Sequence, residues 1–160
     1  MDIRNYEQTI VLKENDIEEI ESLRYLGYLR LWNVNLSRLP RCNNLKVLHI
    51  NLSNLTELSI NPKVQLNKLF CHHCKNLKSI PKDLNDSLEV LHLIDCTKIT
   101  SLPDHLINLT ILSTFNTHIA DIPKTFVNLH KLSVSKQLIT SIPKELVNLI
   151  EGNALELPRV

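Results

Sequence analysis

The 160 residues suffice for one domain, and 43% of them are hydrophobic whereas 4% are aromatic, which predicts a core built from aliphatic side chains. The formal net charge of +1 at pH 7 excludes a strong overall field that would recruit nucleic acid or an anionic membrane. Two glycines, Gly27 and Gly152, are too few for a glycine-rich phosphate loop or a dinucleotide-binding fingerprint.

The N-terminal segment, MDIRNYEQTIVLKENDIEE, lacks a basic stretch followed by an apolar run. No window approaches the roughly 18 uninterrupted apolar residues of a membrane span. We therefore expect a cytoplasmic chain that contacts no membrane, with secretion by an effector route as the alternative. Four cysteines in such a chain predict reduced thiols rather than a disulfide framework.

An apolar frame recurs along the chain. It is clear in LGYLRLWNVNLSRLP (26–40) and returns as LEVLHLIDCTKITSLP (88–103), LTILSTFNTHIADIP (109–123) and LHKLSVSKQLITSIP (129–143). The first residues of the central L-x-L pairs are Ile10, Leu29, Leu48, Leu69, Leu91, Leu112 and Leu132. Their spacing of 19 to 22 residues is the signature of a repeat architecture.

This frame resembles the leucine-rich repeat family pattern, L-x-x-L-x-L-x-x-N/C-x-L-x-x-L-P, over essentially the whole chain. The resemblance implies an α/β repeat fold, a right-handed solenoid with a parallel β-sheet on its concave face and short turns or 3₁₀ helices on its convex face. We expect a single domain over residues 1–160 with about seven repeats and a degenerate C-terminal half repeat near Gly152. The strands should be centred near residues 11, 30, 49, 70, 92, 113 and 133.

Elementary strand geometry predicts the same arrangement. In each L-x-L pair the two apolar residues point to one face of a strand, and the residues between and beside them point to the other. One such strand cannot bury its apolar face alone, but stacked neighbours form a continuous core. The return segments, such as PKTFVNL, are too short for long helices, so we expect 3₁₀ turns or one-turn helices there.

The stretch LFCHHC (69–74) looks at first like part of a metal site. In the repeat register, however, the two cysteines point into the core, whereas Phe70 and His72 face the concave surface and His73 ends the strand. Cys74 occupies the family's conserved asparagine position, which is filled in successive repeats by Asn15, Val34, Ser53, Cys74, Cys96, Thr117 and Gln137. We therefore expect apolar and thiol packing to replace part of an asparagine hydrogen-bond ladder.

The concave face supplies the main functional hypothesis. Its predicted partner-binding residues are Tyr28, Arg30, Trp32, Val47, His49, Phe70, His72, Val90, His92, Ile94, Ile111 and Phe115. Exposed aromatic and apolar side chains clustered on one sheet are typical of a protein-binding surface. We therefore predict a protein–protein interaction module that recognises another protein and has no catalytic activity, no cofactor and no nucleic-acid partner.

Three alternatives stay open. His49, His72 and His92 should converge around Phe70, which would suit a metal- or pH-responsive binder. Asp95 could pair with His92, although no nucleophile in a pocket accompanies them. The chain could also be the recognition arm of a larger assembly, such as a ubiquitin-ligase adaptor or a pathogen effector. We expect a monomer, with end-to-end association as the alternative.

Overall fold

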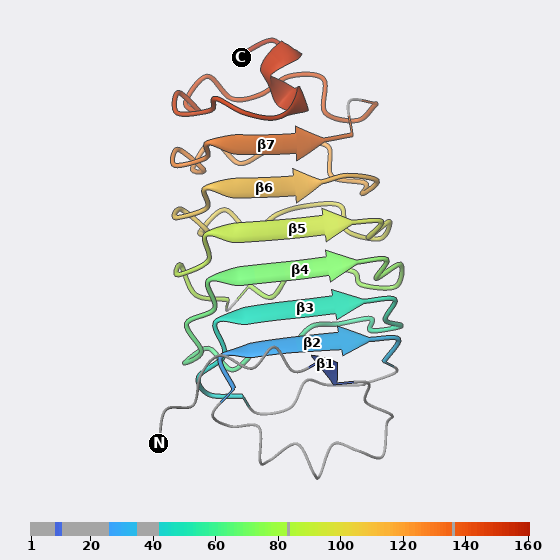
Figure 1. Ribbon diagram of the computed structural model, residues 1–160. Coiled ribbons are helices and arrows are strands. Elements are labelled where there is room, and N and C mark those ends of the chain that lie inside the picture. The colour runs from blue at the N-terminus through green and yellow to red at the C-terminus, as the bar shows by residue number, and fades with distance from the viewer. Residues whose placement is uncertain (1–8, 11–25, 35–41, 83, 136) are drawn as a thin grey trace.

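The structure is a computed structural model that describes residues 9–10, 26–34, 42–82, 84–135 and 137–160. Its elements are β1 (Thr9–Ile10), β2 (Tyr28–Trp32), β3 (Val47–Asn51), β4 (Lys68–His72), β5 (Val90–Ile94), β6 (Ile111–Thr114), β7 (Lys131–Val134) and the 3₁₀ helix η3 (Asn153–Glu156). The strands form one parallel sheet in chain order, from β1 to β7 (Figure 1). One strand per repeat, stacked on the next, makes the molecule a repeat solenoid.

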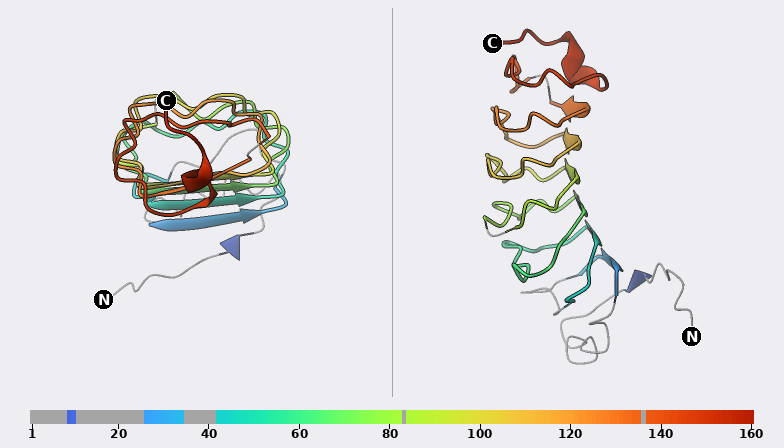
Figure 2. Two further views of the ribbon diagram at one scale, coloured as in Figure 1. Left: turned by 90° about the horizontal axis from the view of Figure 1, so that it is seen from above. Right: turned by 90° about the vertical axis from the view of Figure 1, so that its left-hand side faces the viewer.

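Alternation within the strands decides what the core contains. Leu29 and Leu31 in β2 are buried, and the outward residues on either side of them are not. The same alternation continues through β3, β4, β6 and β7, and β5 departs from it only at Val90. The largest fully buried side chain among the described residues, Phe126, comes from a return segment. Figure 2 shows the strands along one side of the stack and the return segments along the other. The core therefore lies between the sheet and the returns, as expected from the repeat frame.

The returns contain successive turns rather than helices. Phe126 N donates to Pro123 O at 3.2 Å, and Leu129 N donates to Phe126 O at 3.0 Å. The same pair of turns recurs between residues 143 and 149. In the described part of the chain the helix is limited to η3, so the expected α/β repeat is there a β-solenoid with almost no helix. The physical reason is length, because about seven residues after each proline leave room for two turns only.

Asparagines outside the core join neighbouring repeats. Asn108 Nδ2 donates to Asp86 O and Asn128 Nδ2 donates to Ile107 O, both at 2.9 Å. Asn85 and Asn148 make the equivalent bond to the repeat before their own. These bonds satisfy return-segment carbonyls that have no sheet partner. The recurring Asn-Leu pairs at 108–109, 128–129 and 148–149 were the sequence signal for this ladder.

Two sequence-based predictions were wrong at the ends of the repeat series. Ile10 was expected opposite Leu29 but pairs with Leu31, a slip of two residues. Gln137 was expected inside, yet it is exposed because the turn formed by Leu138 N and Ile139 N on Ser135 O carries it outward. Asn15 and the centre of the predicted first strand, residue 11, lie outside the described residues.

A row of left-handed backbone corners follows the strands. Asn33, Leu52, His73, Asp95 and Asn116 have φ angles between 52° and 56° and occupy equivalent positions in five successive repeats. Each donates its backbone N–H to the next repeat; Leu52 N, for example, reaches His72 O at 3.0 Å. Asn, Asp and His tolerate this conformation, whereas a leucine is strained in it.

Replacing the strained leucine should therefore stabilise the fold. We expect Leu52→Asn to raise the free energy of unfolding by about 0.5–1 kcal/mol in urea titrations. Leu138→Asn is the matched control, because Leu138 is 41% exposed against 45% for Leu52 and has no positive φ. An equal gain in both variants would show that solubility rather than backbone relief is responsible.

The two glycines make a second comparison. A Cβ added to Gly152, whose φ is 106°, would lie 1.9 Å from the carbonyl oxygen of Leu132, whereas a Cβ on Gly27 would meet nothing within 4 Å. We expect Gly152→Ala to lower the free energy of unfolding by about 2–4 kcal/mol and Gly27→Ala to change it by less than about 1 kcal/mol. Urea denaturation of both variants measures this, and equal effects would contradict the close contact.

Candidate functional site

The outward residues of β2 to β7 form three rows across the sheet, which we call the open face. The first row is Tyr28, Val47, Lys68, Val90, Ile111 and Lys131. The middle row is Arg30, His49, Phe70, His92, Ser113 and Ser133. The third row is Trp32, Asn51, His72 and Ile94. The parallel register places equivalent residues of successive repeats one strand spacing apart, about 4.8 Å.

Aromatic rings are stacked across the centre of the open face. The ring of Phe70 lies 4.0 Å from that of His49, nearly parallel to it, and 5.0 Å from that of His92, edge to face. Tyr28 extends the stack on the other side of His49 at 5.4 Å. Ring pairs of this kind contribute about 0.5–1.5 kcal/mol each beyond their buried area. The stack therefore fixes these side chains in place before any partner binds.

The histidines converge around Phe70, as the repeat register predicted. His72 lies 6.3 Å from Phe70 and 6.2 Å from His92, measured between ring centroids. On the third row, His72 Nε2 and Asn51 Oδ1 are buried without a hydrogen-bond partner among the residues that the structure describes. Unpaired buried polar atoms are rare in folded proteins, so two on neighbouring strands distinguish this face from ordinary surface.

The predicted partner-binding residues differ in accessibility. Trp32 and Phe115 are the most exposed of the aromatic ones, at 40% and 55%, and Arg30 lies over the Trp32 ring at 5.7 Å. Eight others are half-buried: Tyr28, Val47, His49, Phe70, His72, His92, Ile94 and Ile111. Val90 corrects the prediction, because only 9% of it is exposed at its register position between Lys68 and Ile111. Phe115 lies just beyond the end of β6.

Burial and mutual repulsion keep the imidazoles neutral. The pKa of His49 is lowered to about 4 by burial, and then by Arg30, His72 and His92. Burial also lowers the pKa of His72, with His73 adding to the effect, and that of His92, with His72 and Lys131 adding. In the unbound protein these three side chains are uncharged at neutral pH.

The geometry does not favour the metal-binding alternative. The rings of His72 and His92 lie nearly parallel, with their centroids 6.2 Å apart. Within the described ranges, no group of three or more His, Cys, Asp or Glu side chains is placed to hold a metal ion. Cys71 and Cys74 are buried on the opposite side of the sheet from His72, as the alternation predicted.

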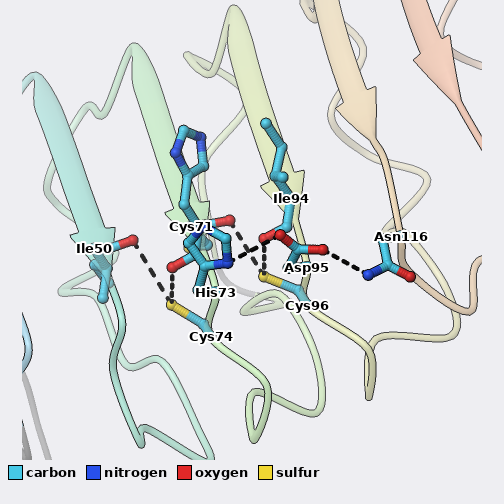
Figure 3. A network of polar contacts seen from close by, with 9 residues as sticks. Ile50, Cys71, His73, Cys74, Ile94, Asp95, Cys96 and Asn116 are labelled. Atoms are coloured by element: carbon cyan, nitrogen blue, oxygen red, sulfur yellow. Dashed lines mark hydrogen bonds and ion pairs between the residues drawn. The ribbon is translucent and has the colours of Figure 1, made fainter.

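The buried thiols act as hydrogen-bond donors. Cys74 Sγ donates to Ile50 O at 3.7 Å, and Cys96 Sγ donates to Cys71 O at 3.2 Å (Figure 3). Ser53 Oγ makes the same kind of bond to Val34 O at 3.0 Å in the preceding repeat. Hydroxyl and thiol groups thus continue the ladder for which we had expected packing alone. Contact with the Cys74 thiol, and then burial, raises the pKa of Cys71 well above its usual range.

A polar network that the sequence did not reveal joins the left-handed corners. Asp95 was a candidate partner for His92, but its carboxylate accepts from His73 Nδ1 at 2.9 Å and from Asn116 Nδ2 at 2.5 Å (Figure 3). Asp95 is itself a left-handed corner just beyond β5, and its carboxylate contacts the neighbouring corners His73 and Asn116. Residue type alone could not show this, because the corner conformation of residues 73, 95 and 116 sets the pairing.

A shallow polar hollow lies near the starts of the later strands. It is lined by Asn67, Ser87, Glu89, Asn108, Thr110, Asn128 and His130. Most of these groups already bond to the backbone; Thr110 Oγ1, for example, donates to Glu89 O at 3.1 Å. The hollow is therefore explained by the contacts between repeats, and the open face is the stronger candidate site.

Comparisons with known proteins do not identify the chain. No protein-family model matches it, and no curated protein matches it in sequence. Among the described residues, no helix has the length and apolar character needed to cross a membrane. Function is therefore inferred from the residues of the open face.

The lowered pKa of His49 predicts acid sensitivity. Its folded value of about 4 lies below the 6.5 of an ordinary histidine, so the unfolded state binds more protons between these values. Stability from neutral His49 is therefore full above about pH 6.5 and is lost as the pH falls toward about 4. We expect an NMR titration midpoint near pH 4, and in His49→Gln a smaller loss of unfolding free energy over this interval. A midpoint near 6.5 would contradict the buried environment.

Proposed function

We propose that this chain is a leucine-rich repeat protein that binds another protein through its open face and catalyses no reaction. The repeat frame supports the family, because each copy coincides with one strand of the parallel sheet. Right-handed winding follows from the resemblance to the family. The binding role rests on side chains presented by the rigid sheet, since no family match supplies it.

The main support for a binding function is the ordered ring stack around Phe70, which is flanked by accessible aromatic side chains. Rings at 4.0 Å and 5.0 Å from Phe70 fix the centre of the face, so little side-chain entropy would be lost on binding. Trp32 and Phe115 are exposed and can insert into a partner, and Trp and Arg are common at interface hot spots.

The proposal of a non-catalytic role follows from the same geometry. Ser113 and Ser133 lie in the middle row of the open face, where Ser113 is opposite His92. Among the described residues, no third group orients the histidine toward either serine. All four cysteines are buried, and Cys74 and Cys96 donate to backbone carbonyls. A role as the recognition arm of a larger assembly is compatible with this face but rests on family analogy alone.

Removing the aromatic anchors should abolish binding without unfolding the chain. We expect the double variant Phe70→Ala, Phe115→Ala to lose at least about tenfold in capture of its partner, because interface aromatics contribute about 2 kcal/mol or more each. Affinity purification from the native cell followed by mass spectrometry identifies the partner, and titration of that purified partner gives the affinities.

Val147→Ala is the matched control, because Val147 is 73% exposed on a return segment far from the open face. It should bind as the wild type does. Circular-dichroism melts of all three proteins show whether folding is retained. Unchanged binding by the double variant, or equal loss in the control, would remove the open face as the binding surface.

A further inference from the structure

The open face is more basic than the chain as a whole. Its fixed charges are Arg30, Lys68 and Lys131, and none of its described outward positions in β2 to β7 carries a carboxylate. The chain overall has a formal charge of only +1. Carboxylates near the face are at its margins, where Glu151 pairs with Lys131 at 3.1 Å between exposed side chains. The exposed pair is screened by water and leaves Lys131 accessible.

Apolar side chains separate these cations. In the first row Val47 precedes Lys68, and Val90 and Ile111 lie between Lys68 and Lys131. Three strand spacings, roughly 14 Å, separate the two lysines. A complementary ligand therefore carries negative groups at intervals with apolar groups between them. That pattern fits a polypeptide in which acidic and aliphatic residues alternate.

The histidines are a second source of positive charge on the open face, but only when they are protonated. His49, His72 and His92 are half-buried, neutral and close together in the unbound protein. The groups on the open face around them are basic or uncharged: Tyr28 and Arg30 from β2, Asn51 from β3, Lys68 from β4, Ser113 from β6 and Lys131 from β7. The corners His73 and Asp95 also act on the pKa of His72, and so does the Cys74 thiol from the other side of the sheet. Asp95 is the one carboxylate in this set, and it is already paired with His73.

We propose that the open face binds an acidic polypeptide segment, and that binding draws protons onto His49, His72 and His92, so that affinity rises as the pH falls. This inference rests on the proposed binding function of the face and adds the chemistry of the partner and its regulation. Carboxylates placed against the face oppose the repulsion from Arg30 and between the histidines. They supply the counter-charge that the described face lacks.

The direction of the pH effect follows from linkage. A partner carboxylate raises the histidine pKa values in the complex above those in the unbound protein, so protons are taken up on binding. Affinity then increases as the pH falls through the bound pKa values and levels off near the unbound ones, about 4 for His49. A free glutamate has a pKa of about 4.3, so the acidic segment itself stays ionised down to about pH 5.

A nucleic acid is the competing ligand and is less favoured. Single-stranded nucleic acids need a continuous positively charged groove with exposed stacking platforms. Here the three fixed cations are interrupted by aliphatic residues, and Phe70 is half-buried between two imidazoles rather than presented flat. Acidic polypeptide and oligonucleotide can be separated directly by experiment.

The test uses a fluorescein-labelled peptide that alternates Glu with Leu and Ser, read by fluorescence anisotropy against the full chain. Matched peptides carry Gln or Lys in place of Glu, and an oligothymidylate represents nucleic acid. We expect only the glutamate peptide to bind, with Kd falling about tenfold between about pH 7.5 and about pH 5.5, as a rise in the His49 pKa from about 4 to about 6.5 would give. Glutamate-peptide binding no tighter than glutamine-peptide binding, or tighter binding of the oligonucleotide, overturns the proposal.

Variants separate the histidine effect from general acid behaviour. The double variant His49→Gln, His92→Gln should lose most of the tenfold gain in affinity for the glutamate peptide between about pH 7.5 and about pH 5.5, when each protein is compared with its own affinity at the higher pH. His118→Gln, whose exposed side chain contacts a return segment at Thr97 O, should keep the gain. A gain that persists in the double variant overturns the proton-uptake step. The acidic peptide could fail to bind while the Phe70→Ala, Phe115→Ala variant still loses its natural partner. That result would overturn only the inference of an acidic partner and would leave the proposed binding function standing.

Discussion

The parallel backbone ladder between successive repeats is the constraint on which the rest of the structure depends. From β2 to β4 the pairing runs without a slip, so Tyr28 lies opposite Val47 and Val47 opposite Lys68. This register places every outward side chain one strand spacing from its equivalent in the next repeat. The ring stack around Phe70 and the separation of the cations are both consequences of it. A slip of one residue would exchange the core for the open face.

The ladder is closed at the ends of β3 to β6 by a left-handed backbone corner followed by a short polar side chain. The left-handed residues direct their N–H groups to the next repeat, and the position that follows supplies a donor such as Ser53 or Cys74. A thiol or hydroxyl here satisfies a buried carbonyl that would otherwise cost about 1–3 kcal/mol unpaired. Variation at this position therefore preserves a hydrogen-bond function although the residue type changes. The backbone therefore stays regular although the residue at this position differs from repeat to repeat.

Burial shifts the pKa values of side chains in opposite directions on the two sides of the sheet. Inward, cysteines and leucines fill space, and burial raises the pKa of the Cys42 thiol to about 11, so that this thiol remains protonated. Outward, partly buried imidazoles sit beside cations, so their pKa values are lowered and they remain neutral. In the unbound state the open face therefore carries neutral histidines, which become positively charged only when they are protonated.

The sequence by itself determined the strand positions and the inward and outward residues, because a period-two alternation within a repeat of 19 to 22 residues leaves one way to bury the leucines. It therefore placed His49, His72 and His92 around Phe70 and sent Cys71 and Cys74 inward. Only the tertiary structure decided the pairings and the burial that depend on backbone conformation and on neighbouring residues. It paired Asp95 with His73, carried Gln137 outward, buried Val90 and moved Ile10 opposite Leu31. These outcomes depend on corner angles and neighbouring repeats, which no alternation pattern within one repeat encodes.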